Sequence, residues 1–356
     1  MKSNEIQVLD PTQRREKGDK GIVINEWEKL TAPSNRRLTH QNLRFLFSLS
    51  WSIDRITIVG NLKEFEFDHT FVTEDGEIFY RAGEKFTLNQ AMPLLASKEA
   101  AERAGNGWRL LDKYGENIAY VETLPFKDPT TGKEKGRIDF NPNKIETFLK
   151  TDLKSFISMM FDNPHFSRAD VACDILDLPD DYVSQYRLVD AVSFRPYYGQ
   201  NGALETAYWG ARSSERQVRM YNKKLEQEKH RQIVPEEVQS WWRLELQLRR
   251  AKADEWSGVV NETLDSFYSP FYFPSDISFR EKAILRGLHA DHSLWSEASD
   301  NTKRKYRKLS KRIAKEDELT QHLKSSFSEN IDTLKRELET WLGAMKVNDE
   351  ESSLVV

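Results

Sequence analysis

Cysteine is nearly absent from this chain of 356 residues, which contains one, Cys173. A single cysteine excludes an intramolecular disulfide and a zinc site built from several cysteines. Cys173 alternates with polar residues along an apparent strand, so it is expected to face a packed core.

Long apolar runs are also absent. Crossing a membrane takes about 18 or more consecutive apolar residues, and no such run occurs. The first 29 residues are polar and lack the apolar centre of a signal peptide. We therefore expect a cytoplasmic protein with no membrane partner.

The common catalytic motifs are missing too. Residues 130–134, Thr-Thr-Gly-Lys-Glu, resemble the end of a phosphate loop, but the earlier glycine is absent and Glu134 replaces the hydroxyl that would hold Mg²⁺. Neither a His-Glu-x-x-His helix nor a Gly-x-Ser-x-Gly turn occurs. These absences argue against ATP hydrolysis, zinc-protease chemistry and serine-hydrolase chemistry.

Charge is balanced overall but unevenly placed. The net charge of −4 argues against indiscriminate nucleic-acid binding. One stretch is nonetheless strongly basic, and Tyr306, Leu309 and Ile313 give it an apolar stripe at helical spacing. Its cations are Lys303, Arg304, Lys305, Arg307, Lys308, Lys311, Arg312 and Lys315. The stretch predicts a helix whose basic side faces either solvent or DNA.

The hydrophobic periodicity predicts an α+β fold: an antiparallel sheet with flanking helices, followed by a mostly helical C-terminal region. Expected strands or hairpins cover residues 51–60, 64–87 with its turn at 75–76, 108–140 with its turn at 129–132, 168–175, 189–197, 204–210, 217–223 and 242–249. Expected helices cover 88–104, 143–160 and three segments between 276 and 345. The expected divisions are a polar arm over 1–44, a domain over 45–268, a helical region over 276–345 and a disordered tail over 346–356.

The strand at 217–223 carries a tyrosine between two cations. Period two places Arg219, Tyr221 and Lys223 on one face, and Val218 and Met220 on the other. A phenol with a pKa near ~10 becomes a usable nucleophile only where cations or a metal stabilise the phenolate or the group attacked. Such a site suits phosphodiester chemistry. The alternative is an ordinary amphipathic strand with exposed cations.

Carboxylates on neighbouring strands are candidate metal ligands. Asp170 and Asp174 share one face of their strand, about 13 Å apart, so one would bind the ion and the other support it. Glu245 occupies the polar face of another strand, and Asp139 that of a third. These oxygens suit Mg²⁺ or Mn²⁺. The alternative is salt bridges across the strands to Arg137, Arg168, Arg243 and Arg249.

Four blocks occur in the order found in a known family. They are residues 136–144 (GRIDFNPNK), 167–177 (SRADVACDILD), 208–227 (YWGARSSERQVRMYNKKLEQ) and 241–250 (WWRLELQLRR). Together they resemble the rolling-circle plasmid replication initiators of the Rep_trans family, of the staphylococcal type. The resemblance extends from about residue 53 to about residue 311.

The resemblance implies a function. Tyr221 would nick one strand of a plasmid origin, keep the new 5′ phosphate as a phosphotyrosine, leave a 3′ hydroxyl primer and later rejoin the strand without ATP. Arg219 and Lys223 would assist catalysis, and the carboxylates described above that we prefer as ligands of Mg²⁺ or Mn²⁺ are Asp170, Glu245 and Asp174. Asp139 ranks below them because several relatives carry glutamate there.

Many tyrosine nickases hold their metal with a His-hydrophobic-His pair, which this chain lacks, since His289 and His292 have the wrong spacing.

DNA binding is assigned to Arg212, Lys303, Arg304, Lys305, Arg307 and Lys308. By analogy, the partners are origin DNA, a second copy of the chain and a host superfamily 1 helicase. Two alternatives stay open: a relaxase of a conjugative element with the same tyrosine, and a catalytically idle DNA-binding regulator.

Overall fold

The computed structural model describes residues 37–39, 46–66, 85–112, 114–145, 153–189, 193–270, 273–291 and 293–342. The expected tail over 346–356 lies outside these residues, as does the expected arm over 1–44 except for 37–39. The hairpin turn expected at 75–76 also lies outside them. The two ends of that hairpin, β3 (Phe65–Glu66) and β4 (Lys85–Phe86), pair as an antiparallel ladder.

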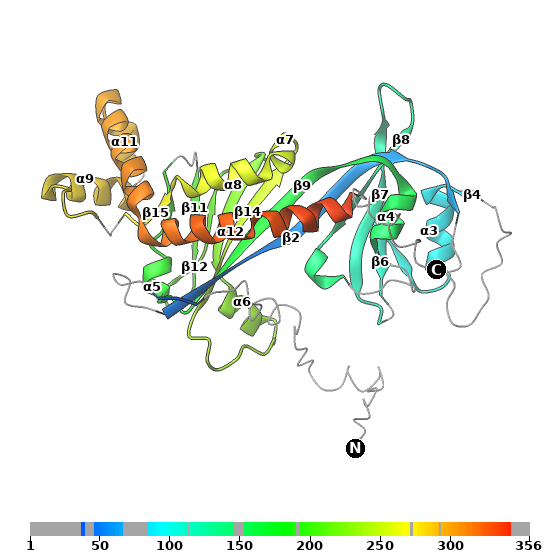
Figure 1. Ribbon diagram of the computed structural model, residues 1–356, viewed down its shortest axis with the longest axis horizontal. Helices are drawn as coiled ribbons and strands as arrows, with labels where there is room; N and C mark the ends of the chain where they lie inside the picture. The colour runs from blue at the N-terminus through cyan, green and yellow to red at the C-terminus, as the bar shows by residue number, and fades with distance from the viewer. Residues whose placement is uncertain are drawn as a thin grey trace, which may run out of the picture.

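One antiparallel sheet dominates the described chain (Figure 1). Its eleven strands run in the order β11-β12-β13-β14-β9-β2-β8-β7-β6-β5, with β1 paired to β2. They are β1 (Arg37–Thr39), β2 (Leu46–Leu62), β5 (Ala101–Ala104), β6 (Gly107–Leu111), β7 (Asn117–Lys127), β8 (Glu134–Phe140), β9 (Phe161–Leu176), β11 (Phe194–Tyr198), β12 (Leu204–Trp209), β13 (Arg216–Asn222) and β14 (Trp241–Arg249). The α+β prediction is confirmed.

Two long strands, β2 and β9, form the centre of this sheet. They pair from Ser48 and Leu176 at one end to Leu62 and Phe161 at the other, and run from one lobe of the molecule to the other (Figure 1). On β9 the side chains alternate: Ala169, Val171, Cys173 and Ile175 are fully buried in the hydrophobic core. The packing predicted for Cys173 is therefore confirmed, and the acidic residues of β9 face the other side.

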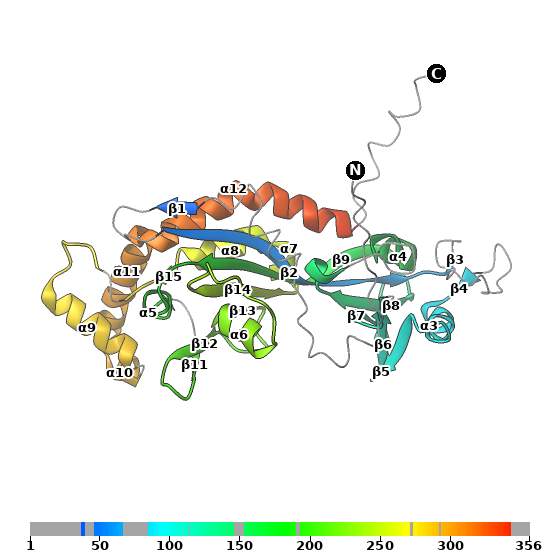
Figure 2. The same cartoon turned by 90° about the horizontal axis from the view of Figure 1, so that it is seen from below.

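Helices cover one face of the sheet around β9, β14 and the first half of β2. They are α7 (Ala251–Asp254), α8 (Trp256–Leu264) and α12 (Glu318–Trp341), and Figure 2 shows α12 lying along this face. Phe327 of α12 contacts Trp51 and Trp256, with ring centroids 4.9 and 6.0 Å apart. The helix α12 thus belongs to the core of the sheet, while the expected boundary between 268 and 276 stays a prediction.

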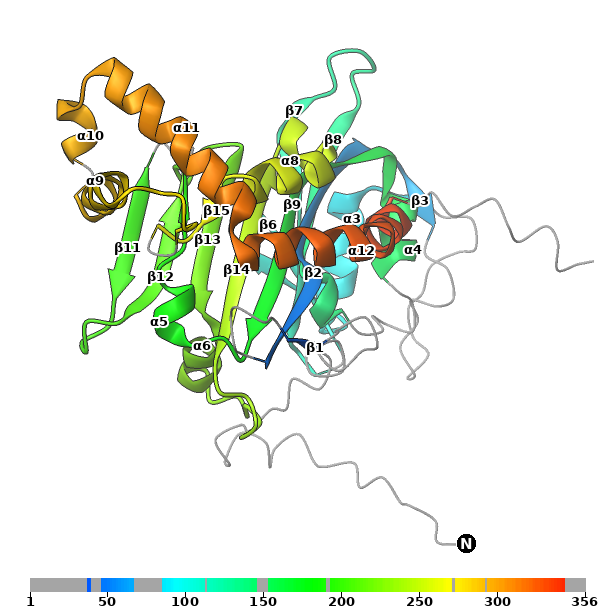
Figure 3. The same ribbon diagram turned by 60° about the vertical axis from the view of Figure 1, so that its left-hand side comes forward.

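A second, smaller core joins the remaining C-terminal helices. These are α9 (Phe279–Ala290), α10 (Ser293–Glu297) and α11 (Asp300–Glu316), which project beyond the β11 end of the sheet (Figures 1 and 3). Leu285, Leu288, Tyr306 and Ile313 pack there against Tyr268 of β15 (Phe267–Tyr268). The strand β15 itself pairs with β10 (Arg187–Leu188).

The strands expected over 51–60 and 168–175 lie inside the longer β2 and β9, and the strand expected over 189–197 begins at Phe194 as β11. Three further differences concern two expected helices and Lys223. The helix expected over 88–104 ends at Ala96 as α3 (Leu88–Ala96), because residues 101–104 pair with β6 through a tight turn whose Gly105 has φ +56°. In the helix expected over 143–160, the structure describes a 3₁₀ turn (Pro142–Lys144) and α4 (Leu153–Met160). Residues 146–152 lie outside the described part.

The third difference concerns Lys223. The strand β13 ends at Asn222, whose side chain accepts from the Leu225 amide and caps α6 (Lys223–Lys229). Lys223 is therefore the first residue of a helix rather than the last residue of a strand. In the described ranges, no helix has both the length and the apolar character that a membrane crossing requires.

Candidate active site around Tyr221

The sheet face opposite α12 carries aligned rows of polar side chains. In one row Thr206, Tyr221, Arg243 and Asp174 are direct cross-strand neighbours on β12, β13, β14 and β9. In the next row Tyr208, Arg219, Glu245 and Ala172 are neighbours on the same strands. Strand alternation thus places a tyrosine, arginines and carboxylates on a single surface.

The three expected catalytic residues meet at this surface. The Arg219 guanidinium lies over the Tyr221 ring, 4.0 Å from its centroid, and the Lys223 ammonium lies 5.8 Å from the same centroid. Lys223 reaches Tyr221 from the start of α6 and donates to Glu226 at 2.6 Å. Tyr221 is 4% exposed, and its hydroxyl has no hydrogen-bond partner among the described residues.

The electrostatics of Tyr221 differ from the expectation of a stabilised phenolate. Burial raises the pKa of Tyr221 well above its usual value, while Arg243 and Arg219 act in the opposite direction. Arg219 contacts the face of the ring as a cation–π partner, and its charge opposes the effect of burial only in part. In the free protein the phenol therefore keeps its proton at neutral pH.

A buried arginine organises the row next to Tyr221. Arg243 is 2% exposed and donates from Nε and Nη2 to the two carboxylate oxygens of Asp174, at 2.8 and 2.7 Å. Its Nη1 donates to Asp54 at 2.9 Å, and Trp241 Nε1 donates to Asp174 at 2.6 Å. The sequence analysis missed Asp54. Its only signal in the sequence is that it interrupts the alternation of polar and apolar residues in β2. In the structure, the register of β2 against β9 shifts at this residue.

The expected metal ligands are already bound to arginines. Asp170 accepts from Arg168 Nε and Nη2 at 2.8 and 2.5 Å, and Glu245 accepts from Arg219 at 2.5 Å. Burial raises the pKa of Asp170 to about 7. Within the described ranges, no three histidine, cysteine or acidic side chains form a group able to hold a metal ion. As arranged here, Asp170, Asp174 and Glu245 fit salt bridges rather than a divalent cation.

Asp139, the lower-ranked candidate, is also paired. It accepts from Arg55 Nε at 2.7 Å and from the Thr57 hydroxyl at 2.8 Å. Its place on β8 separates it from Glu245 on β14 by the two central strands. The structure therefore does not place Asp139 where it could bind the same metal ion as the other carboxylates.

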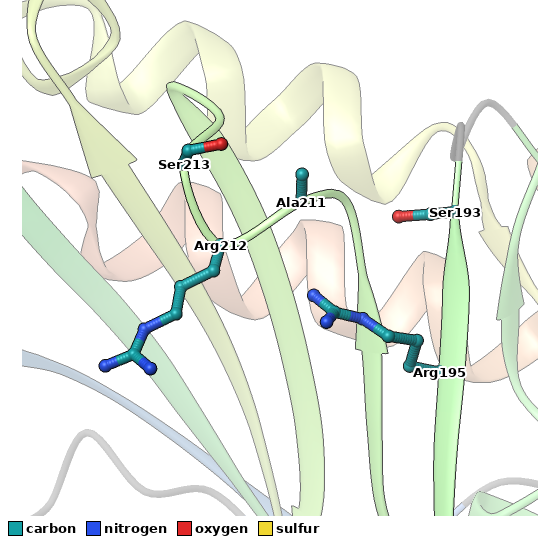
Figure 4. A pocket seen from close by; sticks show the side chains of 5 residues that line it. All are labelled: Ser193, Arg195, Ala211, Arg212 and Ser213. Carbon is teal, nitrogen blue, oxygen red and sulfur yellow. The ribbon is translucent and has the colours of Figure 1, made fainter.

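The expected DNA-binding residues fall in two places. Arg212 lies in the turn between β12 and β13, where it lines an open cleft of about 580 Å³ together with Ser193, Arg195, Ala211 and Ser213 (Figure 4). The other residues lie on α11, whose inward side buries Tyr306, Ser310 and Ile313. Arg304, Lys305, Arg307 and Lys308 are exposed and Lys303 is partly exposed. Lys303 lies 3.9 Å from Asp300, and Lys305 lies 3.2 Å from Glu281.

Comparison with known proteins identifies relatives of one kind. Residues 193–270 match the Rep_trans family, described as replication initiation factor. Two replication initiation proteins of Staphylococcus aureus are each 32% identical over 225 residues, covering 62% of this chain and 68% and 69% of the relatives. A solved rolling circle replication initiator protein from Geobacillus stearothermophilus is 15% identical, with a TM-score of 0.35, over 65% of this chain and 91% of that one.

The staphylococcal relatives place the chain among replication initiation proteins. It belongs to the Rep_trans family, as its four ordered sequence blocks predicted. The matched segment, 193–270, contains β11 to β14 and therefore both Tyr221 and its arginine neighbours.

The pairing of Arg243 predicts a large stability effect. Arg243→Met leaves the buried Asp174 and the partly exposed Asp54 without their cation, and we expect the free energy of unfolding in urea to fall by about 3–5 kcal/mol. The matched control is Arg55→Met, because Arg55 is half exposed and pairs with Asp139 near the surface. That variant should be destabilised by no more than about 1 kcal/mol. Equal destabilisation of the two variants would contradict a structural role for Arg243.

Proposed function

We propose that this protein initiates rolling-circle replication of a plasmid by nicking one strand of its origin through Tyr221. The observation that carries the proposal is the Tyr221 hydroxyl, which has no hydrogen-bond partner among the described residues. It lies near Arg219, Lys223 and Arg243 on the polar sheet face of a replication initiation family member. The Tyr221 oxygen attacks the scissile phosphorus. An oxygen–phosphorus bond to tyrosine forms, and the bond to the 3′ oxygen breaks.

The proton and charge balance follow from the surroundings of Tyr221. The phenol loses its proton to water as it attacks, and the departing 3′ oxygen takes up a proton from water to become the primer hydroxyl, so no net proton is released. Negative charge grows on the phosphate oxygens, and preorganised arginines stabilise such charge strongly where water is largely excluded. Arg219 suits this role because its buried Nε has no hydrogen-bond partner in the described chain. Glu245 holds the same guanidinium through Nη2.

Rejoining is the reverse reaction. A 3′ hydroxyl attacks the phosphotyrosine, the phosphodiester forms, and Tyr221 is released. The bond energy stays in the covalent intermediate, so the reaction needs no ATP, consistent with the incomplete phosphate loop at 130–134.

The first test is Tyr221→Phe, which removes the nucleophile but little surface. We expect no detectable nicking of a supercoiled plasmid carrying the cognate origin, and duplex binding near the wild-type level. Tyr114→Phe is the matched control, because Tyr114 is 56% exposed and lies outside the site. Wild-type nicking by the Tyr221 variant would instead favour another nucleophile, and no nicking by the wild-type protein itself would favour the idle regulator.

The requirement for Mg²⁺ or Mn²⁺ is a prediction from the carboxylates on neighbouring strands, and no step above passes through a metal. If a cation is required, EDTA abolishes nicking and Glu245→Gln raises the concentration of Mg²⁺ or Mn²⁺ needed for half-maximal rate. Arg55→Met is the control, because it changes a charge elsewhere on the sheet and should leave the required metal concentration unchanged. Full activity in EDTA would remove the metal from the mechanism.

Origin recognition is proposed for the exposed basic side of α11. Arg304, Lys308, Lys311 and Lys315 recur every three or four residues on this side. Arg304→Ala with Lys308→Ala should weaken duplex binding and reduce the slope of log K against log salt by about 0.9 for each phosphate that is no longer neutralised. Lys335→Ala with Arg336→Ala, an equally exposed pair on α12, should leave the slope unchanged. An unchanged slope in the α11 variant would mean that the basic side of α11 faces solvent and does not bind DNA phosphates.

A homodimer and a host superfamily 1 helicase as partner are also proposed, from the resemblance alone, and the cytoplasmic location stays a prediction. A relaxase would use the same tyrosine on a transfer origin. Mapping the covalent 5′ adduct to a replication origin or to a transfer origin separates the two functions.

A further inference from the structure

The edge strand β11 presents an aromatic and a basic side chain on the same face as Tyr221. Arg195 is the cross-strand neighbour of Tyr208, which in turn is opposite Arg219. Tyr197 is opposite Thr206, which is opposite Tyr221. The two polar rows of the site therefore continue across β12 to the edge of the sheet.

The two tyrosines on this face contact each other and remain accessible. Tyr197 is 55% exposed, and its ring meets that of Tyr208 edge to face, with centroids 5.7 Å apart at 82°. The packing of β11 against the core is carried by the other side of the strand, where Phe194 stacks on Trp209 at 5.6 Å. An exposed aromatic pair beside a polar site fits a ligand with a flat ring face.

Cations flank this pair. Arg195 and Arg212 line the same open cleft with Ser193 and Ser213, and Figure 4 shows Arg195 reaching from β11 toward the strand and turn that carry Arg212. Two guanidinium groups and two hydroxyls in one cleft suit phosphate groups. The combination of stacking faces with a cationic groove is the chemistry of single-stranded nucleic acid binding.

We propose that the unpaired DNA strand next to the scissile phosphate passes from Tyr221 across β12 to β11. Its bases stack on Tyr208 and Tyr197, and its phosphates bind Arg195 and Arg212. Adjacent strands lie about 4.8 Å apart, so β11 is roughly 10 Å from β13, within reach of the first nucleotides beside the cut. The position of the cut rests on the proposed function, whereas the platform itself is defined by β11 and β12.

These residues favour single-stranded DNA over duplex DNA as the ligand. A duplex hides its base faces in the stack and offers mainly phosphates, which need no aromatic partner. An unpaired base exposes a face to each tyrosine ring. Stacking on an aromatic side chain contributes a similar binding free energy for every base, so binding to the platform does not require the origin sequence.

The test is equilibrium binding of a fluorescent oligothymidylate to the full chain, followed by anisotropy. Tyr197→Ala and Tyr208→Ala should each weaken binding about 5- to 150-fold. Tyr197→Phe, which keeps the ring, should bind within about 2-fold of wild type, and Tyr114→Ala should match wild type. Arg195→Ala with Arg212→Ala should lower the salt slope by about 0.7 for each phosphate that the variant no longer binds.

The same variants distinguish this platform from the proposed nucleophile. Wild-type affinity of both alanine variants for the oligothymidylate, alongside loss of nicking in Tyr221→Phe, overturns the platform and leaves the nucleophile. Weakened binding, alongside nicking by Tyr221→Phe, supports the platform and overturns the nucleophile. An equal loss of affinity for a duplex of the same length would overturn base stacking.

A second measurement does not depend on the folding of the variants. Oligothymidylate in which one base is replaced by 5-iodouracil should, on irradiation, crosslink the wild-type chain at Tyr197 or Tyr208. Peptide mapping that places the crosslinks only outside β11 and β12 would overturn the proposal.

Discussion

The arrangement of the site depends on one buried guanidinium. Arg243 joins β14 to β9 through Asp174 and to β2 through Asp54, and it is the direct neighbour of Tyr221. A buried charge is stable only when it is paired, so these strands cannot shift register without leaving a charge alone. The irregularity of β2 at Asp54 is part of this constraint, because it brings a third element to the same arginine. The position of Tyr221 is therefore fixed from β14, its neighbour in the sheet.

Burial serves two purposes at Tyr221. It raises the pKa of the phenol, so the free protein carries no reactive phenolate. In the proposed reaction, it also strengthens the attraction of Arg219 and Arg243 for the scissile phosphate. In the proposed reaction the carboxylates act as positioning groups. Glu245 holds Arg219 and Asp174 holds Arg243, so the two guanidinium groups are ordered in the free protein. The sequence analysis treated metal ligation and salt bridges as alternatives for these carboxylates, and a salt bridge gives them a part in the proposed reaction without a metal.

The alternation of polar and apolar residues predicted the features that depend on a single strand. It predicted β9, β12, β13 and β14, the shared face of Arg219 and Tyr221, and the buried side of Cys173. The ion pairs depend instead on strand order, and no local pattern indicates that β9 lies between β14 and β2. The alanine-rich stretch at 100–104 shows the same limit, because its helix propensity is overridden by pairing with β6. Lys223 was placed correctly beside Tyr221 but in the wrong element, because the capping role of Asn222 was not recognised.

A buried carboxylate connects the basic helix to the main hydrophobic core. Asp317 stands between α11 and α12 and accepts from the Tyr186 hydroxyl at 3.0 Å and from the backbone amides of Thr320 and Ser269 at 3.0 and 3.2 Å. Because α12 packs in the core of the sheet, these bonds fix where α11 leaves it. The helices α9 to α11 project at the β11 end in every view, so β11 and β12 separate them from Tyr221 (Figures 1, 2 and 3). If α11 binds the duplex and Tyr221 cuts it, as proposed, the cut strand passes over β11, on whose exposed face Arg195 and Tyr197 lie.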